Sequence, residues 1–283
     1  MPIFDQISIY GPGLLGASIA MAIREREISK KIKIWARRAE TLEICREKPW
    51  CDYVTDDTHS GYRGSELIVL CTPVENIITL IEQILPKTES GVLITDVGSV
   101  KNDICASADC FQNLQCGDFV GAHPMAGSDK SGLNHASSNL FDDRTCFVTP
   151  LKHTQTSSVD KVTNFWTSLG MSIQLESPEK HDWIVAQTSH LPHFISSSLA
   201  RYLESTNLEC SSLGGAGLRD STRIAGGDPE LWAQIMRSNQ ENLVEALKLW
   251  LKSTEEALGF LNDGKWEELK AFLEEGAIFR KNL

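Results

Sequence analysis

One histidine in this chain lies between residues with unusual backbone properties: a proline, which restricts the conformation, and glycines, which allow more conformations than other residues. His123 lies in the segment GAHPMAGSDKSG, between Gly121 and Gly127. Pro124 fixes its own φ and biases His123 toward an extended conformation, and the glycines let other groups approach the backbone closely. An imidazole ordinarily titrates near neutral pH. His123 is therefore a candidate for a group that exchanges a proton during a reaction, with an ordinary loop histidine as the alternative.

Two later segments hold side chains suited to binding a substrate. TSHLPH places His190 and His193 three residues apart, on one face of a helix. GLRDSTRIAGGDPELW contains Arg219 and Arg223, whose guanidinium groups suit bidentate binding of a carboxylate, and it ends at Trp232. Other roles stay open for these residues. One histidine could have a core or capping role, either arginine could form a structural salt bridge, and Trp232 could belong to the core.

A GxGxxG motif near the N-terminus predicts a dinucleotide site. It follows a short apolar run and opens a helix at Leu14 and Leu15. Gly11 permits the tight turn, Gly13 lets a pyrophosphate approach, and Gly16 lets helix and strand pack closely. The helix N-terminus offers free N–H groups and the positive end of its dipole to the phosphates.

The end of the second apolar run indicates which dinucleotide binds. NAD sites usually carry an acidic residue there, but this chain has Ala36 followed by Arg37 and Arg38. Guanidinium groups suit a 2′-phosphate, so we expect a preference for NADP, with NAD possible and solvated surface arginines as the alternative. Thr72 and Pro73 close the third apolar run, where such folds place a loop near the cofactor.

The elements that position these residues follow an alternating pattern in the first part of the chain. Short apolar runs alternate with amphipathic helical patterns, which predicts βαβ units and an α/β fold with a Rossmann-type, doubly wound parallel sheet. The expected strands lie at residues 7–10, 32–35, 67–71, 92–96, 119–122, 146–149 and 171–175, and expected helices at 14–24, 74–85 and 159–169.

The pattern changes at Ser177-Pro178, a good helix N-cap followed by a residue suited to the first turn. Strand-like runs then disappear. We expect a dinucleotide-binding domain over residues 1–177 and an all-helical substrate and dimerisation domain over residues 178–283.

A second helix start stands at Asp228-Pro229, and residues 231–261 carry apolar side chains at helical spacing. Long amphipathic helices that include Trp250 and Trp266 need a surface to bury against. A homodimer through these helices would supply one, and packing on the chain's own nucleotide domain is the alternative.

Composition excludes several other classes of protein. The net charge of -11 and the pI near 5.1 argue against nucleic-acid binding, and an anionic substrate would need a local cluster of arginines. The chain has no run of about 18 apolar residues, so we expect no membrane span, and no signal peptide is recognisable. The eight cysteines form no CxxC pair and no HExxH motif occurs, so we expect reduced thiols in a cytoplasmic protein without a metal site.

Five segments of the chain, read together, resemble one known family. In order they are YGPGLLGASIA, TDVGSVK, GAHPMAGSDKSG, TSHLPH and GLRDSTRIAGGDPELW, and they span residues 10–232. They are similar to segments of the prephenate and arogenate dehydrogenases, the TyrA family of tyrosine biosynthesis. The resemblance implies a homodimeric oxidoreductase that decarboxylates prephenate oxidatively to 4-hydroxyphenylpyruvate, with hydride transfer to a nicotinamide cofactor.

The resemblance also implies roles for particular residues. His123 would accept the proton of the substrate hydroxyl, and Ser99 in TDVGSVK would orient His123 or that hydroxyl. His190 and His193 would face the substrate, His193 toward its side chain, and Arg223 would bind a carboxylate. Arg219 has a weaker claim.

Other activities stay open at this point. Arogenate dehydrogenase or a dual-specificity cyclohexadienyl dehydrogenase would use the same scaffold, although His193 favours the keto acid prephenate. A β-hydroxyacid dehydrogenase would need a lysine in a glycine-flanked helical motif, which we do not find. An NADP-sensing regulator would keep the glycine motif but have no reason to place His123, Ser99 and Arg223 together.

Overall fold

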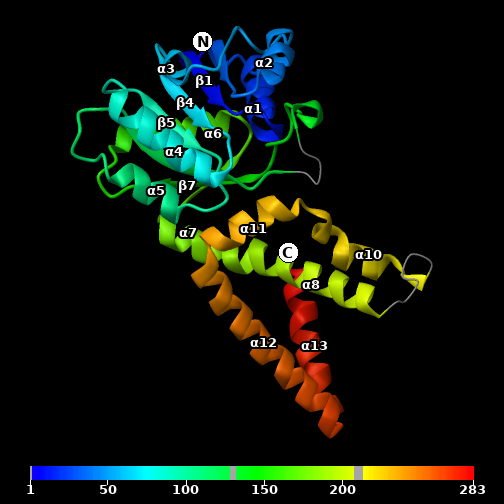
Figure 1. The fold of residues 1–283 in the computed structure, drawn as a ribbon. Helices are drawn as coiled ribbons and strands as arrows, with labels where there is room; N and C mark the ends of the chain where they lie inside the picture. Colours follow the sequence, from blue (N-terminus) through cyan, green and yellow to red (C-terminus); the bar gives the residue numbers. More distant parts are fainter. Residues whose placement is uncertain (1, 128–131, 207–212) are drawn as a thin grey trace.

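The computed structural model describes residues 2–127, 132–206 and 213–283 (Figure 1). Part of the segment around His123, residues 128–131, lies outside the described residues, as does Cys210. The other seven cysteines are free thiols.

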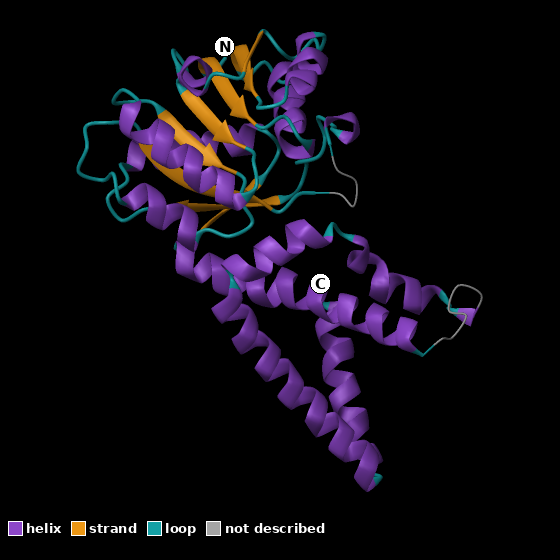
Figure 2. Cartoon of the chain, in the orientation of Figure 1, coloured by secondary structure: helices purple, strands orange, loops and turns teal. Residues whose placement is uncertain are grey.

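The first part of the chain forms an eight-stranded sheet of order β3-β2-β1-β4-β5-β6-β7-β8 (Figure 2). Strands β1 to β6 are parallel, β7 runs antiparallel to β6, and β8 is parallel to β7. The strands are β1 (Phe4–Tyr10), β2 (Ser29–Trp35), β3 (Tyr53–Thr55), β4 (Leu67–Leu70), β5 (Leu93–Asp96), β6 (Asp118–Pro124), β7 (Thr145–Pro150) and β8 (Ser172–Leu175). The predicted doubly wound α/β sheet is confirmed, with one antiparallel pairing added near its edge.

Helices cover both faces of this sheet, because its central strands are apolar on both sides. In β4, Leu67 and Val69 face one core, and Ile68 and Leu70 face the other. The helices and short turns are α1 (Leu14–Glu25), α2 (Ala39–Arg46), α3 (Thr58–Tyr62), α4 (Val74–Ile84), η1 (Leu85–Lys87), α5 (Asn102–Asp109), η2 (Leu133–His135) and α6 (Thr156–Ser168). Buried residues of α1, α2 and α6 belong to the first core, and those of α3, α4 and α5 to the second.

The described residues after β8 are helical. They form α7 (Pro178–Val185), the π-helix η3 (Ala186–His190), α8 (Leu191–Ser205), α10 (Ala216–Thr222), η4 (Arg223–Gly226), α11 (Pro229–Ser238), α12 (Gln240–Asp263) and α13 (Trp266–Lys281). Both predicted helix starts are confirmed. Ser177 Oγ accepts from the N–H of Lys180, and the Asp228 carboxylate accepts from the N–H groups of Glu230 and Leu231.

Helices α12 and α13 extend away from the sheet (Figure 1). The α13 helix has no buried residue, and the Trp266 side chain at its start is 63% exposed. Helix α12 packs on α7, η3, α8 and α13, which does not support the alternative in which these helices pack on their own nucleotide domain. None of the helices within the described residues combines the length and the apolar character that crossing a membrane requires.

The apolar pattern over residues 231–261 does not form one continuous helix. The structure ends α11 at Ser238 and begins α12 at Gln240. Asn239 lies between them, and its side chain is turned inward and 3% exposed. The Asn239 amide is hydrogen bonded to Asp182 of α7 and to His190 of η3.

Candidate active site

The glycine motif forms a tight turn between β1 and α1. Gly11 has a φ of +93°, and a Cβ there would lie 2.9 Å from the carbonyl oxygen of Cys71. A Cβ at Gly16 would overlap the carbonyl oxygen of Gly11. Beside Gly13, in contrast, no atom lies within 4 Å of an added Cβ. The turn is thus packed where strand and helix meet and open where a pyrophosphate would lie.

Groups around this turn suit an anionic dinucleotide. Among the residues that the structure describes, no side chain caps the N-terminus of α1, so its first N–H groups are available to a ligand. The buried Thr72 Oγ1 has no hydrogen-bond partner among the described residues. Leu14, Leu15 and Pro73 border the same turn, at the start of α1 and before α4. These residues fit a dinucleotide whose phosphates bind at the start of α1.

At the end of β2 the structure leaves two arginines available. Ala36 is buried, whereas Arg37 and Arg38 are exposed. Neither arginine forms an ion pair with another described residue. No carboxylate occupies the Ala36 position, where an NAD site usually has one.

The carboxyl ends of the central strands bring several predicted residues to one edge of the sheet. Gly11 follows β1, Thr72 follows β4, Ser99 follows β5, and His123 lies near the end of β6. These strands are parallel, so their carboxyl ends share an edge, which is where doubly wound sheets bind ligands.

His123 is buried at this edge and has a histidine as its neighbour. Its side chain is 8% exposed, and its Nδ1 lies 2.9 Å from Nε2 of His181. Burial, and then the proximity of His181 and of the Lys101 cation, hold the pKa of His123 well below its usual range. His123 is therefore a neutral imidazole at neutral pH, the form that accepts a proton.

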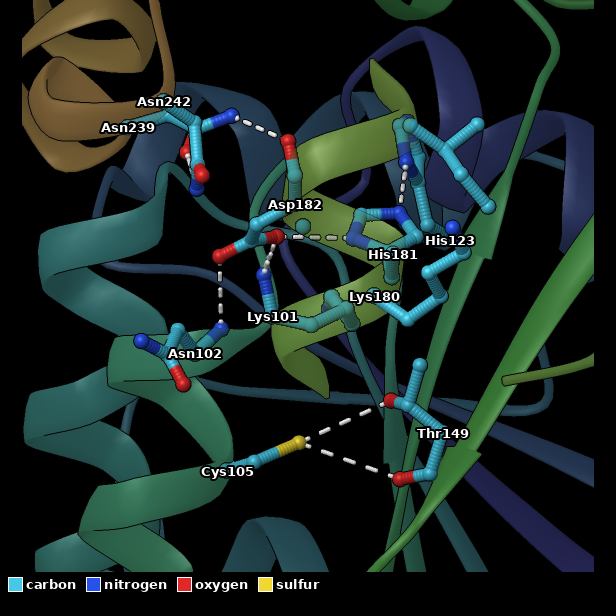
Figure 3. Close-up of polar contacts among 12 residues, drawn as sticks. Lys101, Asn102, Cys105, His123, Thr149, Lys180, His181, Asp182, Asn239 and Asn242 are labelled. Atoms are coloured by element: carbon cyan, nitrogen blue, oxygen red, sulfur yellow. Dashed lines mark hydrogen bonds and ion pairs between the residues drawn. The ribbon is translucent and has the colours of Figure 1, made fainter. Parts of the chain in front are cut away.

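His181 and Asp182 connect His123 to two other elements (Figure 3). His181 Nδ1 lies 2.7 Å from Asp182 Oδ1. The same carboxylate accepts the backbone N–H of Lys101 at 2.7 Å and that of Asn102 at 2.9 Å. Asp182, from α7, thereby caps α5, some eighty residues earlier in the chain.

A fully buried ion pair braces the same region. Lys101 Nζ is hydrogen bonded to Asp96 Oδ2 and donates to the carbonyl of Ala122 at 2.9 Å. Asp96 accepts the N–H of Ala122 at 3.0 Å and that of Gly98 at 2.8 Å. These bonds hold the end of β5 and the loop that contains Ser99 against β6, next to His123.

His190 and His193 lie against the predicted Trp232. The His193 ring stacks on the indole with centroids 3.6 Å apart and planes 12° apart, and the His190 ring meets it edge-on at 6.3 Å. His193 Nδ1 is buried without a partner among the described residues, whereas His190 Nδ1 accepts from Asn239 Nδ2 at 3.1 Å. Burial lowers the pKa of His190 to about 4 and also lowers the pKa of His193.

The two arginines lie in the segment that packs on α8. Ser196 Oγ of α8 donates to the carbonyl of Ser221 at 2.9 Å. Arg223 begins η4 and Arg219 lies in α10, and both are exposed. Neither forms an ion pair in the described part of the chain, so the salt-bridge alternatives are not observed there.

Several residues of the site were not anticipated from the sequence. Within the described residues no hydrogen bond joins Ser99 to His123. The Nδ1 atom of His123 is hydrogen bonded to Nε2 of His181 instead. The sequence did not predict a role for His181, Asp182, Asn239 or the ion pair within TDVGSVK. The only available signal was the pair His181-Asp182 in the first turns of a helix after Ser177-Pro178, which does not point to residue 123.

Comparisons with known proteins match almost the whole chain. The family model described as prephenate dehydrogenase, nucleotide-binding domain, matches residues 19–175, and prephenate dehydrogenase, dimerization domain, matches residues 177–275. The cyclohexadienyl dehydrogenase of Zymomonas mobilis is 31% identical over 251 residues, covering 87% of this chain and 85% of that protein. The prephenate dehydrogenase of Bacillus subtilis is 30% identical over 283 residues, covering 99% of this chain and 76% of that protein.

A solved structure shares the same architecture. The crystal structure of prephenate dehydrogenase from Aquifex aeolicus, in complex with hydroxyphenyl propionate and NAD+, superposes with a TM-score of 0.91 at 27% identity, covering 98% of each chain. The chain therefore belongs to the prephenate dehydrogenase family and is an oxidoreductase that uses a nicotinamide dinucleotide.

Proposed function

We propose that this enzyme converts prephenate to 4-hydroxyphenylpyruvate by oxidative decarboxylation, with hydride transfer to NADP, in tyrosine biosynthesis. The observation that carries the proposal is His123, a buried neutral imidazole on the strand edge that also carries the glycine motif. A bound nicotinamide supplies the acceptor for the hydride that leaves C4 of the substrate ring.

In this reaction His123 takes the proton of the C4 hydroxyl as the hydride leaves. The C1 carboxylate departs as CO2, and its electron pair enters the ring, which becomes aromatic. The proton then returns to the phenolate oxygen. Ser99, in the loop held by the Asp96–Lys101 pair, is proposed to hydrogen bond to the same hydroxyl, because His123 Nδ1 is already engaged by His181.

The substrate's anionic groups would be bound by the helical part of the chain. Arg223 is exposed and forms no ion pair with another described residue, which supports its binding a substrate carboxylate, and Arg219 is a weaker second candidate. His193 has a buried Nδ1 without a described partner and is proposed to contact the side chain of the substrate, with His190 and Trp232 as the wall behind it.

Prephenate is favoured over arogenate because of His193. An imidazole suits a keto acid, whereas the ammonium group of arogenate calls for an anionic or acceptor-only partner. Arogenate or dual specificity is the second candidate, favoured by the similarity to a cyclohexadienyl dehydrogenase.

The cofactor preference is proposed to be NADP. Ala36 removes the carboxylate that would bind a ribose 2′-hydroxyl, and Arg37 and Arg38 are free to bind a 2′-phosphate. NAD is the alternative, because the Aquifex aeolicus enzyme was crystallised with NAD+.

The functional unit is proposed to be a homodimer. Exposed apolar side chains of α12 and α13, among them Leu249, Leu258, Trp266 and Phe279, support burial against a second copy. We propose residues 1–177 as the cofactor domain and 178–283 as the substrate and dimerisation domain. The free thiols of the described cysteines support a cytoplasmic location.

Steady-state kinetics with prephenate and arogenate, each with NADP and with NAD, test the proposal. We expect the highest kcat/KM with prephenate and NADP, and 4-hydroxyphenylpyruvate and CO2 in equal amounts. Arg223→Ala should raise KM for prephenate far more than it lowers kcat. A higher kcat/KM for arogenate would overturn the substrate assignment.

A further inference from the structure

We propose that His181 and Asp182 are positioning residues that hold His123 in the tautomer with its proton on Nδ1, so that the lone pair on Nε2 is left to accept the substrate proton. The inference rests on the proposed role of His123 as proton acceptor. It assigns a function to two buried side chains of α7.

The donor and the acceptor of each hydrogen bond can be assigned beginning from Asp182. Its carboxylate is an acceptor only, and it already accepts the backbone N–H groups of Lys101 and Asn102. Both of these backbone partners are donors. The third partner, His181 Nδ1 at 2.7 Å, must therefore be the donor, and the proton of the His181 ring lies on Nδ1.

The hydrogen bond between His181 and His123 has a defined direction as well. Burial lowers the pKa of His181, so its ring is neutral and its Nε2 carries a lone pair. His123 Nδ1 lies 2.9 Å from that nitrogen and must donate to it. A neutral imidazole carries one proton, so Nε2 of His123 is bare. The chain of bonds thus fixes the tautomer of His123, which lies 58 residues before His181 in the chain.

The neighbours of His181 restrict a flip of its imidazole ring. Its ring meets the Phe147 ring edge-on at 5.1 Å, and Phe147 lies directly opposite His123 in the β6–β7 pair. The backbone carbonyl of Asp182 is held in turn by the Asn239 amide at 2.7 Å (Figure 3). When His123 Nε2 takes a proton, the Nδ1–H bond to His181 persists, and the Asp182 carboxylate lies behind it to stabilise the positive charge.

Two substitutions of His181 separate this role from a structural one. In His181→Asn the amide reaches the place of Nδ1, so the bond to Asp182 is kept and the partner of His123 is lost. In His181→Gln the amide oxygen reaches the place of Nε2 and can accept from His123 Nδ1. We expect His181→Asn to lower kcat about 10²-fold with little change in KM, and His181→Gln to stay within about 10-fold of the wild type. A purely structural role would give the opposite order.

Nitrogen-15 NMR of histidine-labelled enzyme tests the tautomer directly, with His123→Asn used for assignment. We expect the wild-type His123 to carry its proton on Nδ1 at pH 8, and the Nε2–H tautomer to appear in His181→Asn. A wild-type His123 protonated on Nε2 would overturn the inference, and this result does not depend on the folding of any His181 variant.

Different experimental results would overturn the positioning role of His181 and the proposed function of the enzyme. If His123→Asn turns over prephenate at a near-normal rate, His123 is not the acceptor and the proposed function fails. If His123→Asn is inactive but His181→Asn has wild-type kcat and KM, His123 remains the acceptor and only the positioning role is lost.

Discussion

Asn239 donates a hydrogen bond of 2.7 Å from its amide to the backbone carbonyl of Asp182. The same amide reaches His190 Nδ1, so one side chain joins the start of α12 to α7 and to the π-helix η3. Asn239→Ala would leave two buried acceptors without a donor. We expect a loss of about 1–3 kcal/mol in the free energy of unfolding, measured by urea denaturation. Asn242→Ala, which removes only a bond to the Asn239 amide oxygen, is the matched control and should cost less.

His123→Asn should lower kcat by about 10²-fold or more with a smaller effect on KM, because a general base is lost while the binding groups stay. In the wild type the acidic limb of the kcat/KM profile should lie below the usual histidine range, since His123 stays unprotonated until the pH falls beneath its depressed pKa. An acidic limb centred near the ordinary histidine pKa would contradict this assignment.

The stability of the enzyme should fall as the pH is lowered. Folding lowers the pKa of His123, His181, His190 and His193, so below the ordinary histidine value of about 6.5 the unfolded chain binds more protons than the native one. The free energy of unfolding then decreases from about pH 7 toward the pKa of about 4 of His190. Denaturation at a series of pH values measures the slope, and His190→Gln should reduce it. Constant stability over this range would refute the prediction.

Lys101→Met should destabilise the fold strongly. It leaves the fully buried Asp96 carboxylate without its counter-charge, which costs about 3–5 kcal/mol when one partner of a buried pair is removed. Chemical denaturation measures the loss. The double variant of Lys101→Met and Asp96→Asn should recover part of it, and a single-variant loss below about 1 kcal/mol would show that the pair does not brace the site.

Arg37→Asp should reverse the cofactor preference. The substitution removes a guanidinium suited to a 2′-phosphate and supplies a carboxylate suited to a 2′-hydroxyl, and a charge-assisted hydrogen bond contributes about 1.5–3 kcal/mol. We expect the NADP to NAD ratio of kcat/KM to fall by about 10-fold to 100-fold. Arg46→Asp, an equal charge change on the exposed side of α2, should leave the ratio unchanged. An unchanged ratio in Arg37→Asp would refute the NADP assignment.

Local patterns predicted much of the fold. The glycine turn, the N-caps at Ser177 and Asp228 and the continuous apolar run of β4 are dictated by residues near each other in sequence. The three-residue strand β3 was missed because it is too short to show a period.

The sequence predicted individual residues of the site but not the contacts between them. His123, His190 and Trp232 carry recognisable local signals, and the structure brings the last two into contact. The bond from His123 to His181 depends on a long-range approach of β6 and α7, for which no spacing in the sequence is diagnostic. The buried hydrogen bonds of Asn239 could not be predicted for the same reason, since its partners lie some fifty residues away.

The capping of α5 by the Asp182 carboxylate also restricts how the sheet and the helices move relative to each other. Pulling the two apart at this point would strand an anion and two amide donors in the interior, at a cost of several kcal/mol. The first turn of α5 therefore joins the sheet to the helices that follow it, and His123 is connected to this joint by two hydrogen bonds, through His181.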